Sequence, residues 1–554
     1  MSVSPLGNSA VAAAARPAFD ARTKRTVETS LLTAAADKPV DAIVFFKPAA
    51  GHRSAMNALD AAEAMPLGTD RKELVYKSLQ TIGNATLAAN MPALEKLQAA
   101  GQIAGIDTLY SMNAVRVRGA SLEALRSLVG PNVKQIIADS IVAVPTVPNA
   151  LDDSVAGAAM IPLAKFEPGS TINAAEEDPN TIWMDWGTKK MDAPAAWQQG
   201  ITGAGIVIAS LDTGVVTDHP GLKANYRGTK ADGTQDHNYN LWNGIEKGAT
   251  MPIDDVGHGT HTIGSSVGND GKHLVGVAPD ATFIAGRGLG AAGGSLFSLM
   301  AGMEWMMAPT DLQGKNPRAD MAPDIITNSW GGAPVSNPFL WVGLRNWRRA
   351  GIIPVFASGN DRKAQPGKVA APGMHSETII VGATEKDDKR AFFSMYGPSP
   401  LAKGHKPEVM APGTYTYSTY PDGTFRDTFI IDGKEHPASG TSMATPHVAG
   451  AVALYMQAHP KAKYDEILEA LKGSGVLAKN PNDESGWGRV QVDKLIAPGT
   501  IDKDAKLTDS KRVDELMARV GQAKIFGKTT PPGNPGVAPA APDKTIEPFG
   551  AAKK

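Results

Sequence analysis

The 554-residue sequence contains no cysteine, which excludes disulfide frameworks, thiolate zinc sites and cysteine nucleophiles. It also has no run of about 18 consecutive apolar residues, so no membrane-spanning helix is expected. Charge of either sign is not in excess, because 55 Lys and Arg stand against 56 Asp and Glu. Since the basic residues are scattered, no nucleic-acid-binding face is expected. These absences favour a globular protein with no membrane span and no nucleic-acid partner.

Glycine and proline are plentiful, with 58 and 40 residues, and the length exceeds that of one ordinary domain. Composition and apolar periodicity predict five parts. These are a mobile leader (1–38), a compact domain (39–146), a linker rich in Pro, Ala, Asp and Gly (147–180), a larger domain (181–497), and a short helix followed by a Pro-rich disordered tail (498–554).

The compact domain predicted at 39–146 alternates strand and helix patterns. Its elements are expected at Asp41–Pro48 (strand), Arg71–Gly101 (helix), Ile106–Leu109 and Ala114–Val117 (strands), Ser121–Val129 (helix capped by Ser121) and Val133–Ala138 (strand). The order β-α-β-β-α-β is that of a ferredoxin-like α+β domain.

The larger domain has continuous apolar strand patterns separated by helical stretches. The strand patterns lie at 206–211, 281–286, 324–329, 352–358 and 378–384. Strands that are apolar on both faces are typical of a parallel sheet covered by helices on both sides. The sequence therefore predicts an α/β domain with a mainly parallel sheet.

Asp212 follows one of these strands in the segment IVIASLDTGV. Ligand sites in open α/β sheets gather at the carboxyl ends of strands, where this carboxylate should lie. An ordinary turn or cap aspartate would look the same. The DTG triplet also invites an aspartic-protease interpretation, but that chemistry needs two carboxylates and the sequence has one such triplet.

The segment GHGTHTIG places His258 and His261 three residues apart at the start of a helix. Zinc is disfavoured, because no acidic residue lies between the two imidazoles and no third ligand follows at HExxH spacing. A histidine that solvent can reach suits a general base, since its pKa lies near neutrality. His258 is the better candidate, and His261 is expected to be a buried, hydrogen-bonded residue of the helix.

Ser442 lies in SGTSMATPHVAGAVALYM, at the start of a predicted helix. Serine is a common helix N-cap, so an ordinary structural role is one interpretation. The helix amino end also offers N–H groups and a positive dipole, which would stabilise an oxyanion formed beside the hydroxyl. The chain order Asp, His, Ser is that of subtilisin-type catalytic triads.

Residues Trp186 to about Ile496 resemble a subtilase catalytic domain, because DTG, HGTH and GTSMATPHVAG match the three signatures of that family. The segments FSMYGPSP and KPEVMAPG are most similar to its bacillopeptidase F group. The resemblance implies a subtilisin-like three-layer fold and a serine endopeptidase in which Asp212, His258 and Ser442 act together. Residues 39–146 resemble the inhibitor-type pro-domain of subtilases, which implies a proenzyme that cuts itself between about 143 and 180.

The same resemblance extends to further residues. FASGND resembles the family's oxyanion segment, which implies that Asn360 donates a side-chain hydrogen bond to the oxyanion, although a plain turn role for Asn360 is also open. Ala357, Ser358 and Gly359 precede it and would contact substrate. NSWGG resembles the strand that pairs with substrate backbone, which adds Ser329, Trp330 and Gly331.

We expect polypeptide substrates, a monomeric enzyme and no cofactor in the chemistry. Structural calcium stays unassigned, because the loop after the histidine helix carries a single acid, Asp270, beside a lysine. The sequence predicts an extracellular location reached without a visible signal peptide, with a cytoplasmic location as the alternative. Two other functions remain open, namely a dedicated processing protease for one partner and a non-catalytic binding protein with the subtilase fold.

Overall fold

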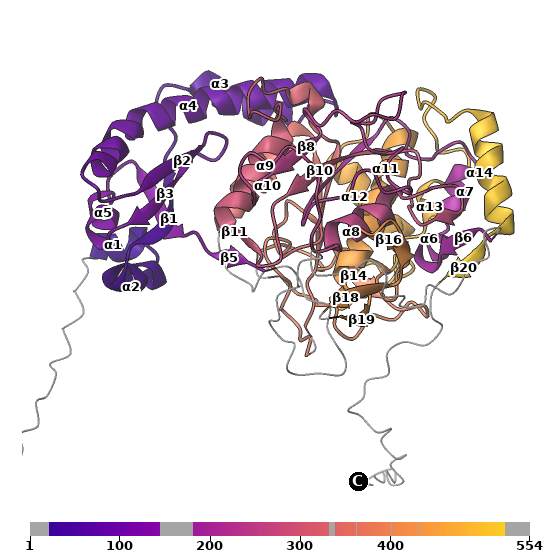
Figure 1. Cartoon of the computed structure of the whole chain (residues 1–554). Coiled ribbons are helices and arrows are strands. Elements are labelled where there is room, and N and C mark those ends of the chain that lie inside the picture. Colours follow the sequence, from indigo (N-terminus) through magenta and orange to yellow (C-terminus); the bar gives the residue numbers. More distant parts are fainter. Residues whose placement is uncertain are drawn as a thin grey trace, which may run out of the picture. The chain divides into compact units, whose positions relative to one another are not determined.

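A computed structural model describes residues 21–143, 181–331, 338–361, 363–399, 401–431 and 433–526 (Figure 1). The predicted linker and the Pro-rich tail lie outside these residues. Contacts divide the chain into two units. The first contains the described residues up to Arg53 and Leu79–Ser140, and the second contains Ser54–Ser78 and the described residues from Ile141 onward. The division differs from the predicted domain 39–146, because residues 54–78 belong with the second unit.

The first unit is built on a four-stranded antiparallel sheet in the order β2-β3-β1-β4. The strands are β1 (Val40–Phe46), β2 (Gly105–Leu109), β3 (Ala114–Ala120) and β4 (Val133–Ala138). The chain passes from β1 to β2 through α4 (Thr69–Ala99), and from β3 to β4 through α5 (Leu122–Ser127). Ser121 caps α5 by accepting a hydrogen bond from the N–H of Ala124. The element order is that of a split β-α-β arrangement.

Two helices stand where the sequence predicts a mobile leader. They are α1 (Ala21–Thr26) and α2 (Thr29–Asp37). Val27, Leu31, Leu32 and Ala35 are buried in the core of the first unit, and Val27 bridges to Ile136 of β4. The interpretation as a leader is therefore wrong for residues 21–37. The apolar residues have helical spacing, which the surrounding Ala and Thr residues obscure.

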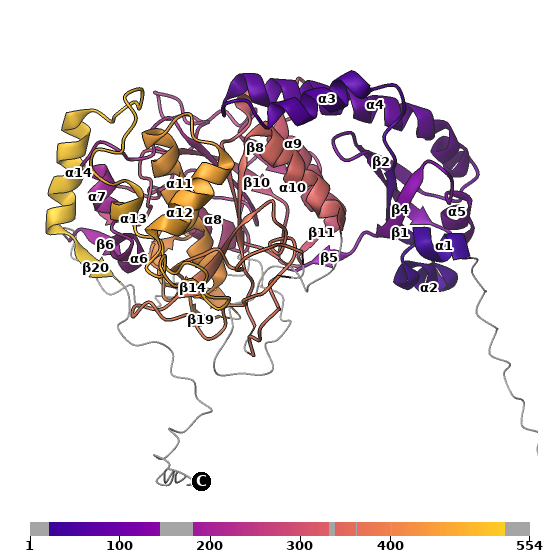
Figure 2. The same ribbon diagram turned by 180° about the vertical axis from the view of Figure 1, so that it is seen from behind.

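A seven-stranded sheet forms the centre of the second unit (Figure 2). Its order is β15 (Val409–Pro412), β14 (Ile379–Thr384), β13 (Ile353–Ala357), β12 (Ile325–Asn328), β7 (Val207–Asp212), β10 (Thr282–Arg287) and β8 (Leu241–Asn243). All six neighbouring pairs are parallel. The predicted parallel α/β sheet is thus confirmed.

Helices cover both faces of this sheet. Leu211 of β7 lies against α9 (Leu296–Met307), since a Cβ added at Gly302 would be 2.8 Å from its Cδ1. Asp212, the next residue, lies against α8 (His258–Val267), because a Cβ added at Gly259 would be 3.2 Å from the Cβ of Asp212. Successive strand residues point to opposite faces. Hence α9, with α10 (Pro338–Ala350) beside it, covers one face, while α8 and α11 (Thr441–Ala458) cover the other.

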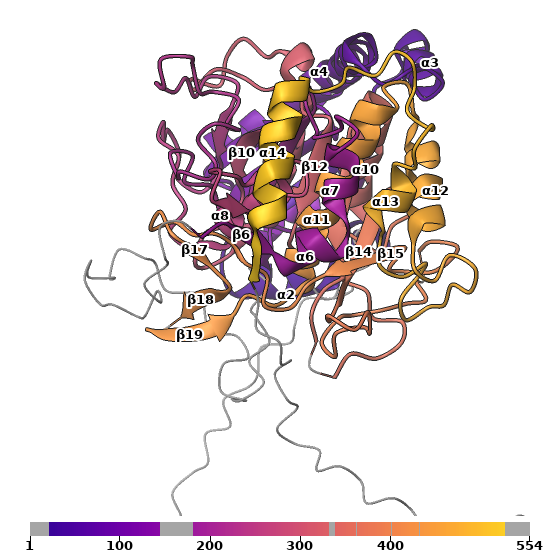
Figure 3. The same cartoon turned by 90° about the vertical axis from the view of Figure 1, so that its right-hand side faces the viewer.

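Further elements complete the second unit. These are the helices α3 (Arg53–Ala62), α6 (Trp186–Lys190), α7 (Ala193–Trp197), α12 (Tyr464–Ser474), α13 (Val492–Leu495) and α14 (Ser510–Gln522), and the strands β5 (Ile141–Val142), β6 (Trp183–Asp185), β9 (His273–Leu274), β11 (Gly294–Ser295), β16 (Ser418–Thr419), β17 (Phe425–Arg426), β18 (Thr428–Ile431), β19 (Lys434–Pro437) and β20 (Lys524–Phe526). The predicted helix after residue 500 is α14, which packs on α7 (Figure 3).

Among the described helices, none combines the length and apolarity that crossing a lipid bilayer would require.

Candidate active site

Three of the predicted site segments follow neighbouring strands at one edge of the central sheet. Asp212 ends β7, Ser329 follows the last residue of β12, and Asn360 lies three residues beyond β13. Because these strands are parallel, their carboxyl ends meet at the same edge. Ser210 is in register with Thr327, so the same register continued by two residues places Asp212 level with Ser329. The fold therefore gathers these side chains from distant parts of the sequence.

Asp212 and His258 form a direct contact. Nδ1 of His258 lies 2.7 Å from Oδ1 of Asp212, and the two side chains are only 2% and 1% exposed. The N–H of Thr213 also donates to Oδ1 of Asp212, at 2.7 Å. The imidazole N–H on Nδ1 is thereby directed at the carboxylate, which leaves Nε2 as the proton-accepting atom of the neutral ring.

A buried carboxylate, Asp254, fixes the start of the helix that carries His258. Its oxygens accept hydrogen bonds from the hydroxyl of Thr213, the hydroxyl and N–H of Thr260, and the N–H groups of Val256 and Gly257. The hydroxyl of Thr213 in turn accepts from the N–H of Gly259. No motif in the sequence predicted this network. The available signal was an acid four residues before the histidine, in DDVGHGT.

Burial and charge act in opposite directions on His258. Burial alone would lower its pKa, but the carboxylates of Asp212 and Asp254 outweigh burial, and the pKa of His258 is raised above its ordinary value. His261 has no such partner, and burial lowers its pKa to about 3. Its Nε2 faces the carbonyl oxygen of Arg426 at 3.2 Å. The prediction of a buried, hydrogen-bonded His261 is confirmed.

Ser442 is the second residue of α11 and is 3% exposed. Its hydroxyl donates to the carbonyl oxygen of Ser329 at 3.0 Å, and the Ser329 hydroxyl donates to the carbonyl oxygen of Ser442 at 2.8 Å. Within the described part of the chain, no hydrogen bond joins Ser442 to His258, and Nε2 of His258 is buried without a partner. The structure thus brings Asp212 to His258 and Ser442 to Ser329.

Asn360 is held by the first residue of α11. Its Oδ1 accepts from the N–H and the hydroxyl of Thr441, at 2.9 and 3.0 Å. Since Oδ1 is occupied in this way, the donor Nδ2 is turned toward Gly440, where an added Cβ would lie 3.3 Å from it. A side-chain N–H donor therefore stands beside the helix start that carries Ser442.

The other residues predicted to contact substrate have buried side chains or none. Trp330 is 1% exposed and packs edge-on against Phe356, with ring centroids 5.3 Å apart. Ala357 and Ser358 are 4% and 0% exposed, and the N–H of Ser358 donates to the carbonyl of Val381. Gly359 has φ +97°, and a Cβ at Gly331 would lie 3.0 Å from Ala370. These residues can offer a substrate only backbone groups.

An extended segment of the chain pairs with a strand that the sequence analysis did not single out. Ile141 and Val142 of β5 lie antiparallel to Ser295 and Gly294 of β11. At Gly293, which has φ +83°, an added Cβ would lie 2.4 Å from the carbonyl oxygen of Val142. The glycine is needed for this close approach, and the GG pair in GAAGGS was the available signal.

Metal-binding side chains do not gather in the described residues, which contain no cluster of three or more His, Asp or Glu able to hold an ion. Asp270, the acid of the loop after α8, accepts from the N–H groups of Lys272 and His273 and contacts the His273 ring at 2.9 Å.

Comparisons with known proteins place most of the second unit in one family. The family model described as the subtilase family matches residues 203–488. Bacillopeptidase F of Bacillus subtilis (strain 168) is 37% identical over 324 residues, which are 56% of this chain and 22% of that protein. M-protease of Shouchella clausii (strain KSM-K16) is 33% identical over 318 residues, 56% of this chain and 71% of that protein. Subtilisin Savinase of Lederbergia lenta is 33% identical over 301 residues, which are 54% of this chain and 94% of that protein.

Proposed function

This chain belongs to the subtilase family of serine proteases, and on that premise we propose that it is a serine endopeptidase made as a self-processed proenzyme. Its substrates are extended polypeptides, and the reaction passes through an acyl-enzyme on Ser442. The observation that carries the proposal is the buried contact between Asp212 and His258, with the partnerless Nε2 on the opposite side of the same ring.

The first chemical step is nucleophilic attack. The Ser442 hydroxyl turns from the Ser329 carbonyl to Nε2 of His258, gives up its proton there, and its oxygen attacks the substrate carbonyl. Asp212 keeps the N–H on Nδ1 and offsets the positive charge that develops on the ring, without becoming protonated itself. His258 then returns the proton to the leaving amine, and a water molecule releases the acyl group by the reverse steps.

The charge that develops on the substrate oxygen needs donors. In this proposal they are Nδ2 of Asn360 and the N–H of Ser442 at the amino end of α11. Oδ1 of Asn360 is already bound to Thr441, so the amide is held with its donor end free. Such preorganised donors act in a buried site, where electrostatic interactions are stronger than in water.

Backbone pairing is the expected mode of substrate binding. The antiparallel pairing of Ile141–Val142 with β11 supports it, because it is an extended segment added to a strand of the second unit. In this proposal the substrate strand lies between β11 and a second segment, which consists of Ser329, Trp330 and Gly331. Main-chain hydrogen bonds of this kind bind many sequences, whereas side-chain pockets set preference. The proposal is therefore a broad-specificity enzyme.

Self-processing and export complete the proposal. Residues 39–146 act as an intramolecular inhibitor and folding aid, which suits a parallel-sheet protein whose many non-local contacts form slowly. The cut falls between about 143 and 180, close after β5. The mature enzyme acts outside the cell, and finding it only inside intact producing cells would remove this part of the proposal.

The Ser442→Ala variant of the full chain tests the proposed function. We expect the parent to be purified as two pieces with a new amino terminus between 143 and 180, and the variant to be purified at full mass. Ser510→Ala, a change at an exposed residue at the start of α14, is the matched control and should be processed like the parent. Normal processing of Ser442→Ala, with no protease added, would remove self-cleavage from the account.

A further inference from the structure

Residues Ser54–Ser78, here called the anchor segment, belong to the second unit although the flanking residues on both sides belong to the first. The segment comprises α3 and the first turns of α4. It precedes the proposed cut, so it belongs to the part of the chain that processing would separate. Its contacts with residues after the cut would therefore become contacts between two separate fragments once the chain is divided.

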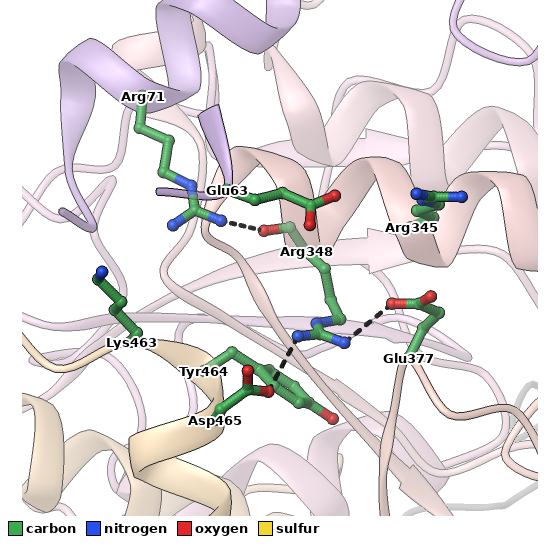
Figure 4. A pocket seen from close by; sticks show the side chains of 8 residues that line it. All are labelled: Glu63, Arg71, Arg345, Arg348, Glu377, Lys463, Tyr464 and Asp465. Carbon is green, nitrogen blue, oxygen red and sulfur yellow. Dashed lines mark hydrogen bonds and ion pairs between the residues drawn. The ribbon is translucent and has the colours of Figure 1, made fainter. Parts of the chain in front are cut away.

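Arg71 binds the carboxyl end of α10. Its Nε donates to the carbonyl of Arg349 at 2.7 Å, and its Nη2 donates to the carbonyl of Arg348 at 2.7 Å. Figure 4 shows the Arg71 guanidinium directed at Arg348. The last carbonyls of a helix lack partners within the helix and carry partial negative charge. A buried arginine, 5% exposed, satisfies two of them.

The end of α10 is shaped to receive this side chain. Gly351 follows the helix with φ +81°, and a Cβ there would lie 2.9 Å from Leu67 and 3.3 Å from Arg71. The glycine thus ends the helix and also leaves room for two side chains of the anchor segment. Leu67 packs against the apolar core of the second unit.

Lys72, the next residue, makes an ion pair in which the lysine is buried and the aspartate is partly exposed. Its ammonium group lies 2.7 Å from Oδ1 of Asp324 and donates to the carbonyl of Ala322 at 3.0 Å. The two side chains are 7% and 23% exposed. Oδ2 of Asp324 accepts from the N–H of Val207, at the start of the central strand β7. Removing Asp324 would leave the charge of the buried Lys72 without its ionic partner, which is unfavourable.

Peripheral contacts surround these two residues. Arg349 meets Asp60 at 2.8 Å and Glu63 at 3.3 Å. Both acids are exposed, so these pairs should contribute little. A pocket of about 150 Å³ lies beside Arg71 and is lined by charged residues that include Glu63, Arg348 and Glu377 (Figure 4). Among the polar contacts of the anchor segment, those of Arg71 and Lys72 are therefore expected to contribute most.

We propose that the anchor segment, through Arg71 and Lys72, attaches the N-terminal region to the catalytic unit, in addition to the pairing of β5 with β11. This attachment keeps the N-terminal fragment bound without a covalent link after the chain is cut, by contacts with α10 and Asp324 that involve none of the candidate catalytic residues. The inference rests on the proposed function, because it concerns the fate of a region that processing detaches.

The test uses the full chain with Ser442→Ala, so that it does not depend on self-cleavage. A recognition sequence for an unrelated, sequence-specific protease is inserted between residues 150 and 175, the chain is cut there, and dissociation of the two fragments is followed by gel filtration and surface plasmon resonance. Arg71→Ala/Lys72→Ala is compared with Lys77→Ala, which removes a lysine of the same helix whose side chain is 71% exposed.

The cut parent and the Lys77→Ala control are expected to stay together. The double variant should dissociate at least about 30-fold faster, the effect of truncating one buried, hydrogen-bonded charge at an interface. Melting of the uncut chains shows whether each variant is folded. Separation of the parent fragments on cutting, or equal dissociation rates for the parent and the folded double variant, overturns the proposal.

A second comparison keeps the proposal testable if the double variant does not fold. Lys72→Met and Asp324→Asn are made singly and together, since each removes one side of the same ion pair. If the pair holds the fragments together, the two changes are non-additive. The dissociation rate of the double variant then rises by less than the product of the two single-variant increases. Additive effects would show that Lys72 and Asp324 do not act as a pair in the attachment.

Discussion

His258 and His261 lie one turn apart in α8, and both are almost fully buried. Their pKa values nevertheless move in opposite directions. The difference comes from their partners, because Nδ1 of His258 meets a carboxylate and Nε2 of His261 meets a backbone carbonyl. A base that takes up a proton during catalysis needs a nearby negative charge. At the scale of single residues, His258 is therefore suited to proton transfer and His261 to packing.

Asn360 gives a prediction at the residue scale. Asn360→Asp keeps an oxygen to accept from Thr441 but removes the Nδ2 donor, and Asn360→Ala removes both. We expect kcat to fall roughly 10²–10³-fold in each, the loss seen when this kind of donor is removed from subtilisin, with KM little changed. Steady-state kinetics with a peptide substrate, at a known concentration of active sites, would measure kcat and KM for each variant.

Thr441→Ser is the control for this prediction, because it keeps the N–H and the hydroxyl that hold Oδ1 of Asn360. It should keep turnover near that of the parent. An unchanged kcat in Asn360→Ala would show that Asn360 only shapes the turn after Gly359, which was the alternative interpretation of FASGND.

At the scale of elements, the start of α8 depends on Asp254 more than on any capping residue of the helix itself. Gly257, the residue before the helix, has no side chain to cap it, and Asp254 receives five hydrogen bonds from the segment 213–260. The carboxylate thus joins the end of β7 to the start of α8, and with them Asp212 to His258.

Replacing Asp254 tests this role. Asp254→Asn keeps the shape but turns an amide N–H₂ group toward N–H and O–H donors, so several buried donors lose their partner. We expect a loss of about 2–3 kcal/mol in the free energy of unfolding, measured by urea unfolding in the Ser442→Ala background. Asp218→Asn, at an exposed position, should have no such effect. Equal stability of the two variants would mean that the network around Asp254 is not what holds α8.

The sequence predicted the strands and motifs of the second unit better than the contacts between distant residues. Continuous apolar runs gave β7, β10, β12, β13 and β14, because burial on both faces leaves a pattern in the sequence itself. The DTG, HGTH and GTSMATPHVAG motifs predicted Asp212, His258 and Ser442, because each motif is a short contiguous run of residues. The helix α2 was missed because Ala and Thr weaken its periodicity. The Asp254 network was missed because its meaning lies in contacts with Thr213, 41 residues away.

At the scale of the whole molecule, contacts between distant segments determine which parts of the chain belong to the same unit, and local sequence patterns do not show these contacts. Phe526 of β20 stacks on Tyr417 with ring centroids 3.9 Å apart, and β20 pairs with β6 more than 330 residues earlier. The anchor segment joins the second unit through Lys72 and Asp324, which are 252 residues apart. No periodicity within residues 39–146 signals that residues 54–78 belong elsewhere, so the predicted boundaries could not include this division.

The central claim is that folding brings His258 to activate Ser442, two residues 184 positions apart in the sequence. Labelling with a small fluorophosphonate, followed by mass spectrometry and repeated across pH, tests it most directly. Below the pKa of His258 the ring is protonated and cannot accept the serine proton, so the labelling rate should rise with pH. Because Asp212 and Asp254 raise that pKa, the midpoint should lie above about 6.5. The account predicts one adduct, on Ser442, and loss of the pH-dependent rate in His258→Ala. An adduct on another residue, or a labelling rate that His258→Ala leaves unchanged, would contradict it.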